Sequence, residues 1–391
     1  MKRFILVIAT LFLCVVSFAK TDPYDLTAGP WVTNVTDSSF TVLWTTAKTG
    51  IAFVDVVEGD LKGSWFKADK KRVYQRLGGR YYPCTLHTVT VNHLKPGTRY
   101  RYRIGGKQLI DQIDPYEYTY GFERYSAKPY EVTTFDSHAS TCSFSAVNDM
   151  HLMVEKYSNL IQTESTLSKD FILLNGDIIS AGDYSLDSLI YYNLGPLDKL
   201  TQKLPVMFVK GNHEGRGNVY EQANQIYPTS TREYYYTFRQ GPVAFLVLDA
   251  GETGYEPSIG FSGAPAYVDY LQEQLEWAGK AVSEPSFASA PVKVCLIHVP
   301  MIGNADSANY STLTWMAEYF VPFLNSAGID LMVSAHKHVF SLRQPGELGN
   351  NFPIFVNSNH DRLEFEADAH SVHIRTYGED GKESHSFDLS L

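Results

Sequence analysis

The hydrophobic pattern of the chain changes character near its middle. Before residue 136, short runs of β-branched and aromatic residues alternate with turn residues such as Pro96-Gly97 and Gly105-Gly106. Runs of this kind predict strands. They cover Trp31 to Val35, Phe40 to Thr45, Ile51 to Val57, Thr85 to Val91 and Arg99 to Ile104. Several short strands at this spacing predict a β-sandwich.

After the segment from Asp136 to Thr141, apolar runs alternate with helical patterns, as in βαβ units. The predicted helices cover Glu155 to Ser168, Tyr184 to Gln202, Ala266 to Val282 and Leu313 to Asn325. The last two have apolar residues three or four apart. The end of the chain is strand-like again, over Pro353 to Asn357, Leu363 to Glu366, Ser371 to Arg375 and Glu383 to Leu389. This β-rich ending predicts a second sheet packed on the first.

The first residues have the composition of a secretory signal peptide. Lys2 and Arg3 precede an apolar run from Phe4 to Val16, and small residues follow at Ser17-Phe18-Ala19. The alternative is an uncleaved membrane anchor, but the run is shorter than the roughly 20 residues of a spanning helix. We therefore predict a secreted or periplasmic protein with a signal peptide at 1–19, a β-sandwich domain at 20–138 and an α/β domain at 139–391.

Charge and cysteine content narrow the classes of partner. The formal net charge is -10, and it becomes -12 when Lys2 and Arg3 are removed. Such a surface repels nucleic acid and anionic membranes, so we predict no nucleic-acid surface and no membrane span after signal cleavage. The remaining cysteines, Cys84, Cys142 and Cys295, are odd in number. Their placement favours buried thiols over one disulfide with a spare thiol.

Five apolar runs of the second half each end on residues that bind metal ions. The residues are Asp149 and His151, then Asp177, then Asn212-His213-Glu214, then His298, and finally His336 and His338. The carboxyl ends of parallel strands form the ligand crevice of an α/β sheet, so these side chains are expected to meet. Each motif alone has a structural explanation, because Asn-Gly-Asp is a common turn and a single histidine is usually structural. Their consistent order after apolar strands favours one joint metal site.

Two groups of tyrosines have alternative interpretations. Alternating aromatic residues between Tyr116 and Tyr125 favour strand packing over a carbohydrate or substrate platform. Tyr184, Tyr220 and Tyr255 lie in loops near the metal-binding motifs and suit stacking on a nucleoside or sugar leaving group, but exposed tyrosines are common in a chain so rich in them.

These motifs resemble those of calcineurin-like metallophosphoesterases, whose pattern is DxH, GD, GNHE, H and GHxH. The resemblance covers Cys142 to Phe340, and Ala335 replaces the glycine of the last motif. The N-terminal half, with Gly29-Pro30-Trp31 and the run from Leu94 to Tyr100, is similar to the fibronectin-III-like domain of purple acid phosphatases. The resemblance implies an α/β fold: a four-layer α/β/β/α sandwich preceded by an all-β fibronectin-III-like sandwich.

The resemblance also implies two divalent metal ions, either Zn, Mn or Fe. One ion would be held by Asp149, His151, Asp177 and His338, and the other by Asp177, Asn212, His298 and His336. Asp177 would bridge them. Purple acid phosphatases carry a tyrosine ligand three residues after this aspartate, where this chain has Ser180, and they lack a histidine at the position of His151. Tyrosinate coordination of iron is therefore not expected.

The implied activity is hydrolysis of a phosphate ester by attack of a metal-bridging hydroxide, with His213 as the general acid. Glu214 is expected to orient a histidine, and Arg216 either contacts the substrate phosphate or is a solvated loop residue. The partner is a phosphorylated small molecule or polymer. The alternatives are a phosphodiesterase instead of a phosphomonoesterase, or a catalytically inactive secreted binding protein.

Overall fold

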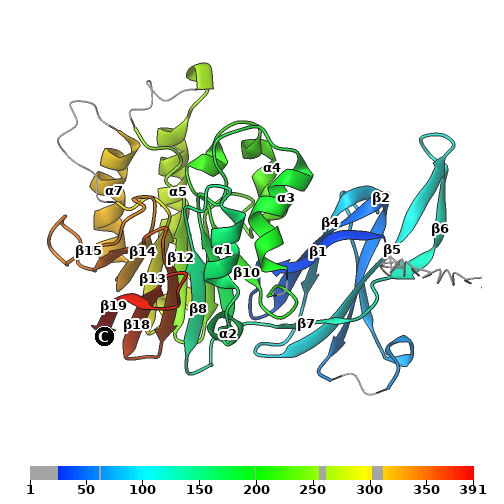
Figure 1. Cartoon of the computed structure of the whole chain (residues 1–391), viewed down its shortest axis with the longest axis horizontal. Helices are drawn as coiled ribbons and strands as arrows, with labels where there is room; N and C mark the ends of the chain where they lie inside the picture. Colours follow the sequence, from blue (N-terminus) through cyan, green and yellow to red (C-terminus); the bar gives the residue numbers. More distant parts are fainter. Residues whose placement is uncertain (1–24, 61–62, 199, 255–260, 302–310) are drawn as a thin grey trace, which may run out of the picture.

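The computed structural model describes residues 25–391, apart from 61–62, 199, 255–260 and 302–310 (Figure 1). The predicted signal peptide at 1–19 and Tyr255 lie outside the described residues. Within the described residues, no helix is long and apolar enough to cross a membrane.

The N-terminal part is all β, as predicted, and is followed by a mixed α/β part. Its strands are β1 (Leu26–Thr33), β2 (Ser39–Glu58), β3 (Lys71–Tyr74), β4 (Cys84–Asn92), β5 (Arg99–Gln112), β6 (Tyr118–Tyr125) and β7 (Tyr130–Thr133), with a short 3-10 helix at Trp65–Lys67. Two predicted strands are joined in β2. Its first half pairs with β1 and β4, and its second half pairs with β3 and β5. Trp44, Val54 and Tyr102 are buried and belong to one apolar cluster, which the strands of this part share.

The first sheet of the α/β part is built on three parallel strands. They are β8 (Cys142–Val147), β9 (Phe171–Asn175) and β10 (Val206–Val209). Their near-continuous apolar sequence suits strands that are covered on both faces. β10 also pairs with β1 through Thr33 and Val206, which links the two parts of the molecule.

The C-terminal strands do not form a separate sheet of their own, contrary to the prediction. β17 (Arg362–Ala367), β18 (Ser371–Tyr377) and β19 (Glu383–Ser390) extend the first sheet beyond β8, whereas β16 (Ile354–Val356) belongs to the second. The second sheet contains β11 (Tyr236–Gln240), β12 (Val243–Leu248), β13 (Val292–Ile297), β14 (Leu331–Ser334), β16 and β15 (Ser341–Arg343). Phenylalanines of both sheets belong to one apolar cluster, and Phe144 of the first sheet meets Phe245 of the second edge-on, with ring centroids 5.9 Å apart.

Helices cover the outer faces of both sheets and complete the four layers (Figure 1). Apolar residues of α1 (Val154–Ile161), α3 (Leu186–Leu194) and α4 (Val219–Ile226) pack on the first sheet. Those of α5 (Tyr267–Ala281), α6 (Pro285–Ala288) and α7 (Thr312–Ser326) pack on the second. Two predicted helices are shorter than expected: the first ends at Ile161, before the four-residue α2 (Glu164–Leu167), and the second passes into a 3-10 turn (Gly195–Leu197) at Pro196. Helix α4 was not predicted.

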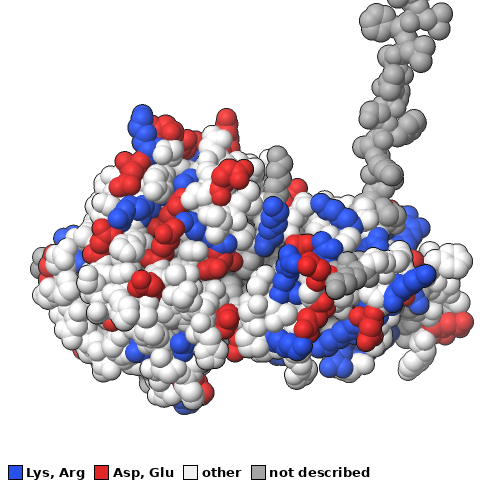
Figure 2. All heavy atoms as spheres, turned by 90° about the horizontal axis from the view of Figure 1, so that it is seen from below, with Lys and Arg blue, Asp and Glu red and all other residues white. Residues whose placement is uncertain are grey.

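The cysteines, the aromatic run of β6 and the surface charge bear on three expectations from the sequence. Cys84, Cys142 and Cys295 are free thiols, as predicted, and the last two are buried. The aromatic run does form strand β6, but Phe122 on it is 95% exposed, so packing does not explain this residue. Basic and acidic side chains are intermixed on the face shown in Figure 2, so the negative charge is not concentrated there.

Candidate metal centre

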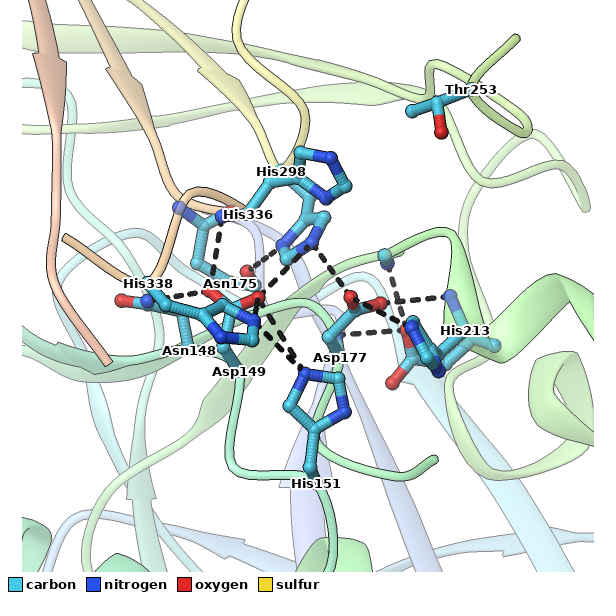
Figure 3. Close-up of polar contacts among 12 residues, drawn as sticks. Asn148, Asp149, His151, Asn175, Asp177, His213, Thr253, His298, His336 and His338 are labelled. Carbon is cyan, nitrogen blue, oxygen red and sulfur yellow. Dashed lines mark hydrogen bonds and ion pairs between the residues drawn. The ribbon is translucent and has the colours of Figure 1, made fainter. Parts of the chain in front are cut away.

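The metal-binding residues predicted from the sequence come together at one end of the two sheets. Asp149 follows β8, Asp177 follows β9, Asn212 follows β10, His298 follows β13 and His336 follows β14. The side chains of Asp149, Asp177, His298 and His338 lie close together (Figure 3). The ligand atoms form three overlapping groups, which are Asp149-His151-His338, Asp177-His298-His336 and His151-Asp177-His213.

The first group lies toward the solvent. Nε2 of His338 is 3.2 Å from Oδ1 of Asp149 and 3.2 Å from Nε2 of His151. Asp149 is fully buried, whereas His338 is exposed on one side. Ser180, which stands where purple acid phosphatases have tyrosine, places its Oγ 3.4 Å from Nδ1 of His151.

The second group is deeper. Nε2 of the buried His298 lies 3.1 Å from Oδ2 of Asp177 and 3.7 Å from Oδ1 of Asp149. On its other side, Nδ1 of His298 is 2.7 Å from the carbonyl oxygen of Asn175. A hydrogen bond to this carbonyl fixes the proton of a neutral ring on Nδ1, which leaves Nε2 free to bind an ion.

Buried polar atoms without hydrogen bonds indicate that the site suits cations. Oδ1 of Asp149 and Nε2 of His298 make no hydrogen bond of good geometry among the described residues, although Nε2 of His338 lies 3.2 Å from the first atom and Oδ2 of Asp177 lies 3.1 Å from the second. Burial of such atoms is unfavourable unless another group binds them. Carboxylate oxygen and imidazole nitrogen are ligands of Zn, Mn and Fe. The donor set therefore fits the dinuclear metal centre implied by the sequence.

The side-chain oxygen of Asn212 also faces only hydrogen-bond acceptors. Its oxygen, as oriented, faces Nδ1 of His336 at 3.0 Å and Oδ2 of Asp177 at 3.3 Å, and all three atoms are acceptors. Without an ion, the amide satisfies these neighbours only by turning its nitrogen toward them and its oxygen toward Arg216. A bound cation would instead require the oxygen to point inward.

The backbone at the strand ends adopts conformations that are costly for residues with side chains. Positive φ angles occur at Asp149 (52°), His151 (43°), Asp177 (52°), His336 (70°) and His338 (60°). Each costs roughly 1 kcal/mol or more. Gly176 and Gly211 allow the loops to approach closely, since a Cβ on Gly176 would lie 2.5 Å from Nδ1 of His298.

The loop after β10 holds His213 beside the ligands. The N–H of Ala181 donates to Nδ1 of His213 at 3.1 Å, and Nε2 lies 3.9 Å from Oδ2 of Asp177. Arg216 places Nη1 3.1 Å from the same Nε2, while its other nitrogens bind Glu252 at 2.6 and 2.9 Å. Burial lowers the pKa of His213, Asp177 raises it and Arg216 lowers it again.

Glu214 does not orient a histidine, contrary to the prediction. Its buried carboxylate accepts the backbone N–H groups of Asp177 (2.9 Å), Ile178 (3.0 Å) and Gly211 (2.9 Å). Burial, together with the charge of Asp177, raises the pKa of Glu214 to about 7. The residue therefore fixes the backbone that carries the central aspartate.

A buried asparagine pair that the sequence did not reveal orients Asp149. Nδ2 of Asn148 donates to Oδ2 of Asp149 at 2.8 Å, and Nδ2 of Asn357 donates to Oδ1 of Asn148 at 2.8 Å. Asn357 follows β16, at the same end of the second sheet as the histidines. Oδ2 of Asp149 therefore accepts a hydrogen bond from Asn148, and Oδ1 is left to face the histidines.

Protonation within the deeper group is governed by the two aspartates. Burial alone lowers the pKa of His298, but the charges of Asp177 and Asp149 outweigh it and raise that pKa to about 10. Burial and the neighbouring His298 lower the pKa of His336 to about 4. In the absence of ions, a proton on His298 thus neutralises part of the negative charge that cations would otherwise balance.

Comparisons with known proteins agree with this architecture. Residues 143–340 match the family model "Calcineurin-like phosphoesterase", and residues 30–134 match "Purple acid Phosphatase, N-terminal domain". Purple acid phosphatase 23 of Arabidopsis thaliana is 23% identical over 347 residues, covering 78% of this chain and 72% of the relative. Purple acid phosphatase 15 of the same plant is 24% identical over 291 residues, covering 65% of this chain and 49% of the relative.

A solved structure has the same fold over most of the chain. Purple acid phosphatase PPD1 from yellow lupin seeds aligns with a TM-score of 0.66 and 15% sequence identity. The alignment covers 92% of this chain and 74% of the lupin protein. At this identity the likeness concerns the fold, an N-terminal β domain followed by an α/β domain.

Proposed function

The chain belongs to the calcineurin-like phosphoesterase family and is a metal-dependent phosphoesterase, and we propose that it is a secreted or periplasmic enzyme that hydrolyses a phosphate ester at a dinuclear centre. The observation that carries this proposal is the convergence of three metal-binding groups on Asp149 and Asp177. Both aspartates are buried, and Oδ1 of Asp149 lacks a hydrogen bond within the described part of the chain.

We propose the two ligand sets that the resemblance implies, which are supported by the groups Asp149-His151-His338 and Asp177-His298-His336. Asp149, His151, Asp177 and His338 would hold one ion, and Asp177, Asn212, His298 and His336 would hold the other. Bound divalent ions supply positive charge that polarises a phosphoryl group and lowers the pKa of water. The chain's own residues orient the ligands: Glu214 holds the backbone of Asp177, and Asn148 holds Asp149. Ser180 in place of a tyrosine supports a centre without tyrosinate-bound iron.

His213 is proposed to give a proton to the leaving oxygen. Nδ1 accepts the N–H of Ala181, so a neutral ring that gives up a proton carries it on Nε2. Nη1 of Arg216, which can only donate, lies 3.1 Å from Nε2, so Nε2 is protonated only when Arg216 turns toward the substrate phosphate. The positive charge of Arg216 lies close to the ring. It disfavours a doubly protonated ring and so favours transfer of the proton away from it. Glu252 anchors Arg216 through two hydrogen bonds, which supports a role for Arg216 near the substrate phosphate over that of a freely solvated residue.

Metal reconstitution tests the proposal. The full chain is stripped with a chelator and assayed with Mn or Zn on glycerol phosphate, a monoester, and on bis(p-nitrophenyl) phosphate, a diester. Restored hydrolysis of either class is expected, and the ratio between them assigns the enzyme to monoesters or diesters. A protein that binds the ions but hydrolyses neither class would favour the inactive binding protein.

A further inference from the structure

Exposed apolar side chains are concentrated at one end of the N-terminal β part. Of the fifteen large apolar side chains that are exposed in the described part of the chain, six lie within residues 77–122. We call these six the outer patch. They are Leu77, Tyr81, Ile110, Ile113, Tyr116 and Phe122, and they are between 47% and 95% exposed. Such a concentration of apolar surface on a soluble protein marks an interaction site.

Two neighbouring loops carry the outer patch. Strands β3 and β5 both run antiparallel to β2, with Tyr74 and Gly105 each opposite Phe53, so they leave β2 at the same end. The turn between β3 and β4 and the hairpin of β5 and β6 therefore project together. The guanidinium of Arg80 in the turn lies over the ring of Tyr118 in the hairpin, 4.9 Å from its centroid. Figure 1 shows this hairpin at the end of the molecule away from the α/β part.

The turn holds its side chains in a defined position in the solvent. The backbones of Leu77 and Arg80 exchange two hydrogen bonds, at 2.9 and 3.0 Å, around Gly78 and Gly79, whose φ angles are 55° and 81°. A Cβ on either glycine would meet no atom within 4 Å. Leu77 is therefore held at a protruding tip by an ordered backbone, and binding of a partner costs little further ordering.

Charges of opposite sign lie in two separate regions of the outer patch. Arg76 and Arg80 are exposed on the turn, and Asp111, Asp114 and Glu117 are exposed on the hairpin. Asp114 also orders the hairpin loop, because its Oδ1 accepts two backbone N–H groups at 2.6 and 2.9 Å. The patch therefore combines apolar side chains with a cationic turn and an anionic hairpin.

This arrangement disfavours a membrane, a polyanion or a sugar as the partner. Ile113 and Tyr116 would enter a bilayer only together with the neighbouring carboxylate of Asp114, and burial of a carboxylate in lipid is costly. The acidic hairpin also repels nucleic acids and other polyanions. The ring face of Tyr118 that Arg80 covers is not available to stack on a sugar. A protein surface that presents both signs of charge fits the patch best.

We propose that the outer patch binds the outer patch of a second copy of this chain and so forms a two-fold symmetric dimer. A two-fold axis between the turn and the hairpin places the cationic turn of one copy against the anionic hairpin of the other, and symmetry repeats the contact. Each copy thus supplies the complement of its own charges, and the apolar side chains between them are buried. The candidate metal centre belongs to the α/β part, so this pairing does not cover it.

Sedimentation equilibrium of the full chain tests the dimer. The wild type should associate with a Kd of about 1 to 100 µM, because the surface is of modest size. Leu77→Ser/Phe122→Ser should raise the Kd at least about 10-fold, and both side chains are exposed enough for the fold to tolerate the change. A wild type that is still monomeric at about 500 µM would overturn the proposal.

Charge reversal distinguishes this surface from any other route of self-association. Arg76→Glu/Arg80→Glu makes the turn anionic, and Asp111→Lys/Glu117→Lys makes the hairpin cationic. Each variant alone brings like charges together, so its Kd should rise at least about 10-fold. An equimolar mixture of the two variants should recover association, because each copy then meets the opposite charge at both contacts.

Glu276→Lys/Glu284→Lys is the matched control, since it reverses two exposed carboxylates of the α/β part and should associate like the wild type. A dimer that the outer-patch variants leave intact, or a mixture that fails to recover, would overturn the assignment. So would a monomeric wild type that binds phosphatidylglycerol vesicles or heparin. Phosphate-ester hydrolysis by the metal-loaded variants should be unchanged, so the outcome for the dimer is independent of the phosphatase proposal.

Discussion

The buried aspartates and histidines of the two parts of the molecule have different surroundings. In the N-terminal β part, His87 contacts the hydroxyl of Thr46 at 2.8 Å through Nε2 and Oε1 of Gln75 at 3.3 Å through Nδ1. Buried Asp55 receives two hydrogen bonds from Arg72, at 2.7 and 2.9 Å. In the α/β part, by contrast, Asp149 Oδ1 and His298 Nε2 are equally buried but are without hydrogen bonds within the described chain.

The difference separates a stabilising network from a binding site. A buried group whose partners are all present contributes to the fold, because its lost hydration is replaced. A cluster of buried carboxylates and imidazoles is unfavourable until a proton or a metal cation balances its negative charge. The same criterion distinguishes His87, within β4, from His298, just after β13, although both histidines are buried.

Among the substitutions considered, Asp177→Asn should have the largest effect on metal content and turnover. A small effect would contradict the assignment of the α/β part's buried aspartates to a metal site. The substitution removes the charge shared by both predicted ion sites, so at least one ion should be lost and hydrolysis abolished. Loss of metal affinity should exceed the roughly 10- to 100-fold that loss of an outer partner causes. Elemental analysis and a turnover assay measure both, and full occupancy with full activity would refute the two-metal assignment.

The second largest effect is expected for His213, the histidine beside the proposed ligands. His213→Ala should lower turnover by roughly 10² to 10⁴-fold, the contribution of a general acid, and leave both ions bound. Because His213 also lies within one metal-binding group, metal content is the deciding measurement. An ion lost from this variant would reassign His213 as a ligand.

The smallest predicted effect concerns His87 of the N-terminal β part and the dependence of stability on pH. Burial lowers the pKa of His87 to about 3, whereas the unfolded residue titrates near 6.5. Between these values the unfolded chain binds a proton that the folded chain does not, so stability falls as the pH falls. The loss amounts to about 2 kcal/mol between pH 7 and pH 5.

Chemical denaturation of wild type and His87→Gln at these two pH values isolates that contribution. The variant should lose about 2 kcal/mol less than the wild type. His138→Gln, a change at an exposed histidine near the domain junction, should retain the slope of the wild type. Equal slopes for His87→Gln and wild type would show that His87 is not held neutral by burial.

The sequence predicted the strand ends well because each follows an uninterrupted apolar run. Buried parallel strands require that pattern, and although each polar motif alone has a structural explanation, the consistent order of all five after apolar runs favoured a joint site. The Asn148-Asn357 contact was beyond reach, since it joins residues from two sheets and neither lies in a distinctive motif. Glu214 illustrates a second limit: its position in GNHE indicated a supporting role, but its backbone partners at Asp177 and Ile178 depend on how the β9 and β10 loops approach.

Secondary structure was predictable where periodicity was strong. The 15-residue helix α5 follows its apolar spacing closely, whereas α4 is only eight residues long, too short to show a clear period, and was missed. The two expected strands are joined in β2, whose pairing with β4 has a register shift between Thr45 and Gly50. The two halves of β2 pair with different strands, and the sequence did not indicate this change of partners.

The position of β8 has a consequence for the order in which the protein assembles. β8 lies between β9, which follows it closely, and β17, which comes near the end of the chain and pairs Leu363 with Ala146. During synthesis, Asp149 and Asp177 therefore emerge long before the strand that completes their sheet. Contacts between such distant segments form slowly, so we expect the centre to mature only after the ribosome has released the whole chain.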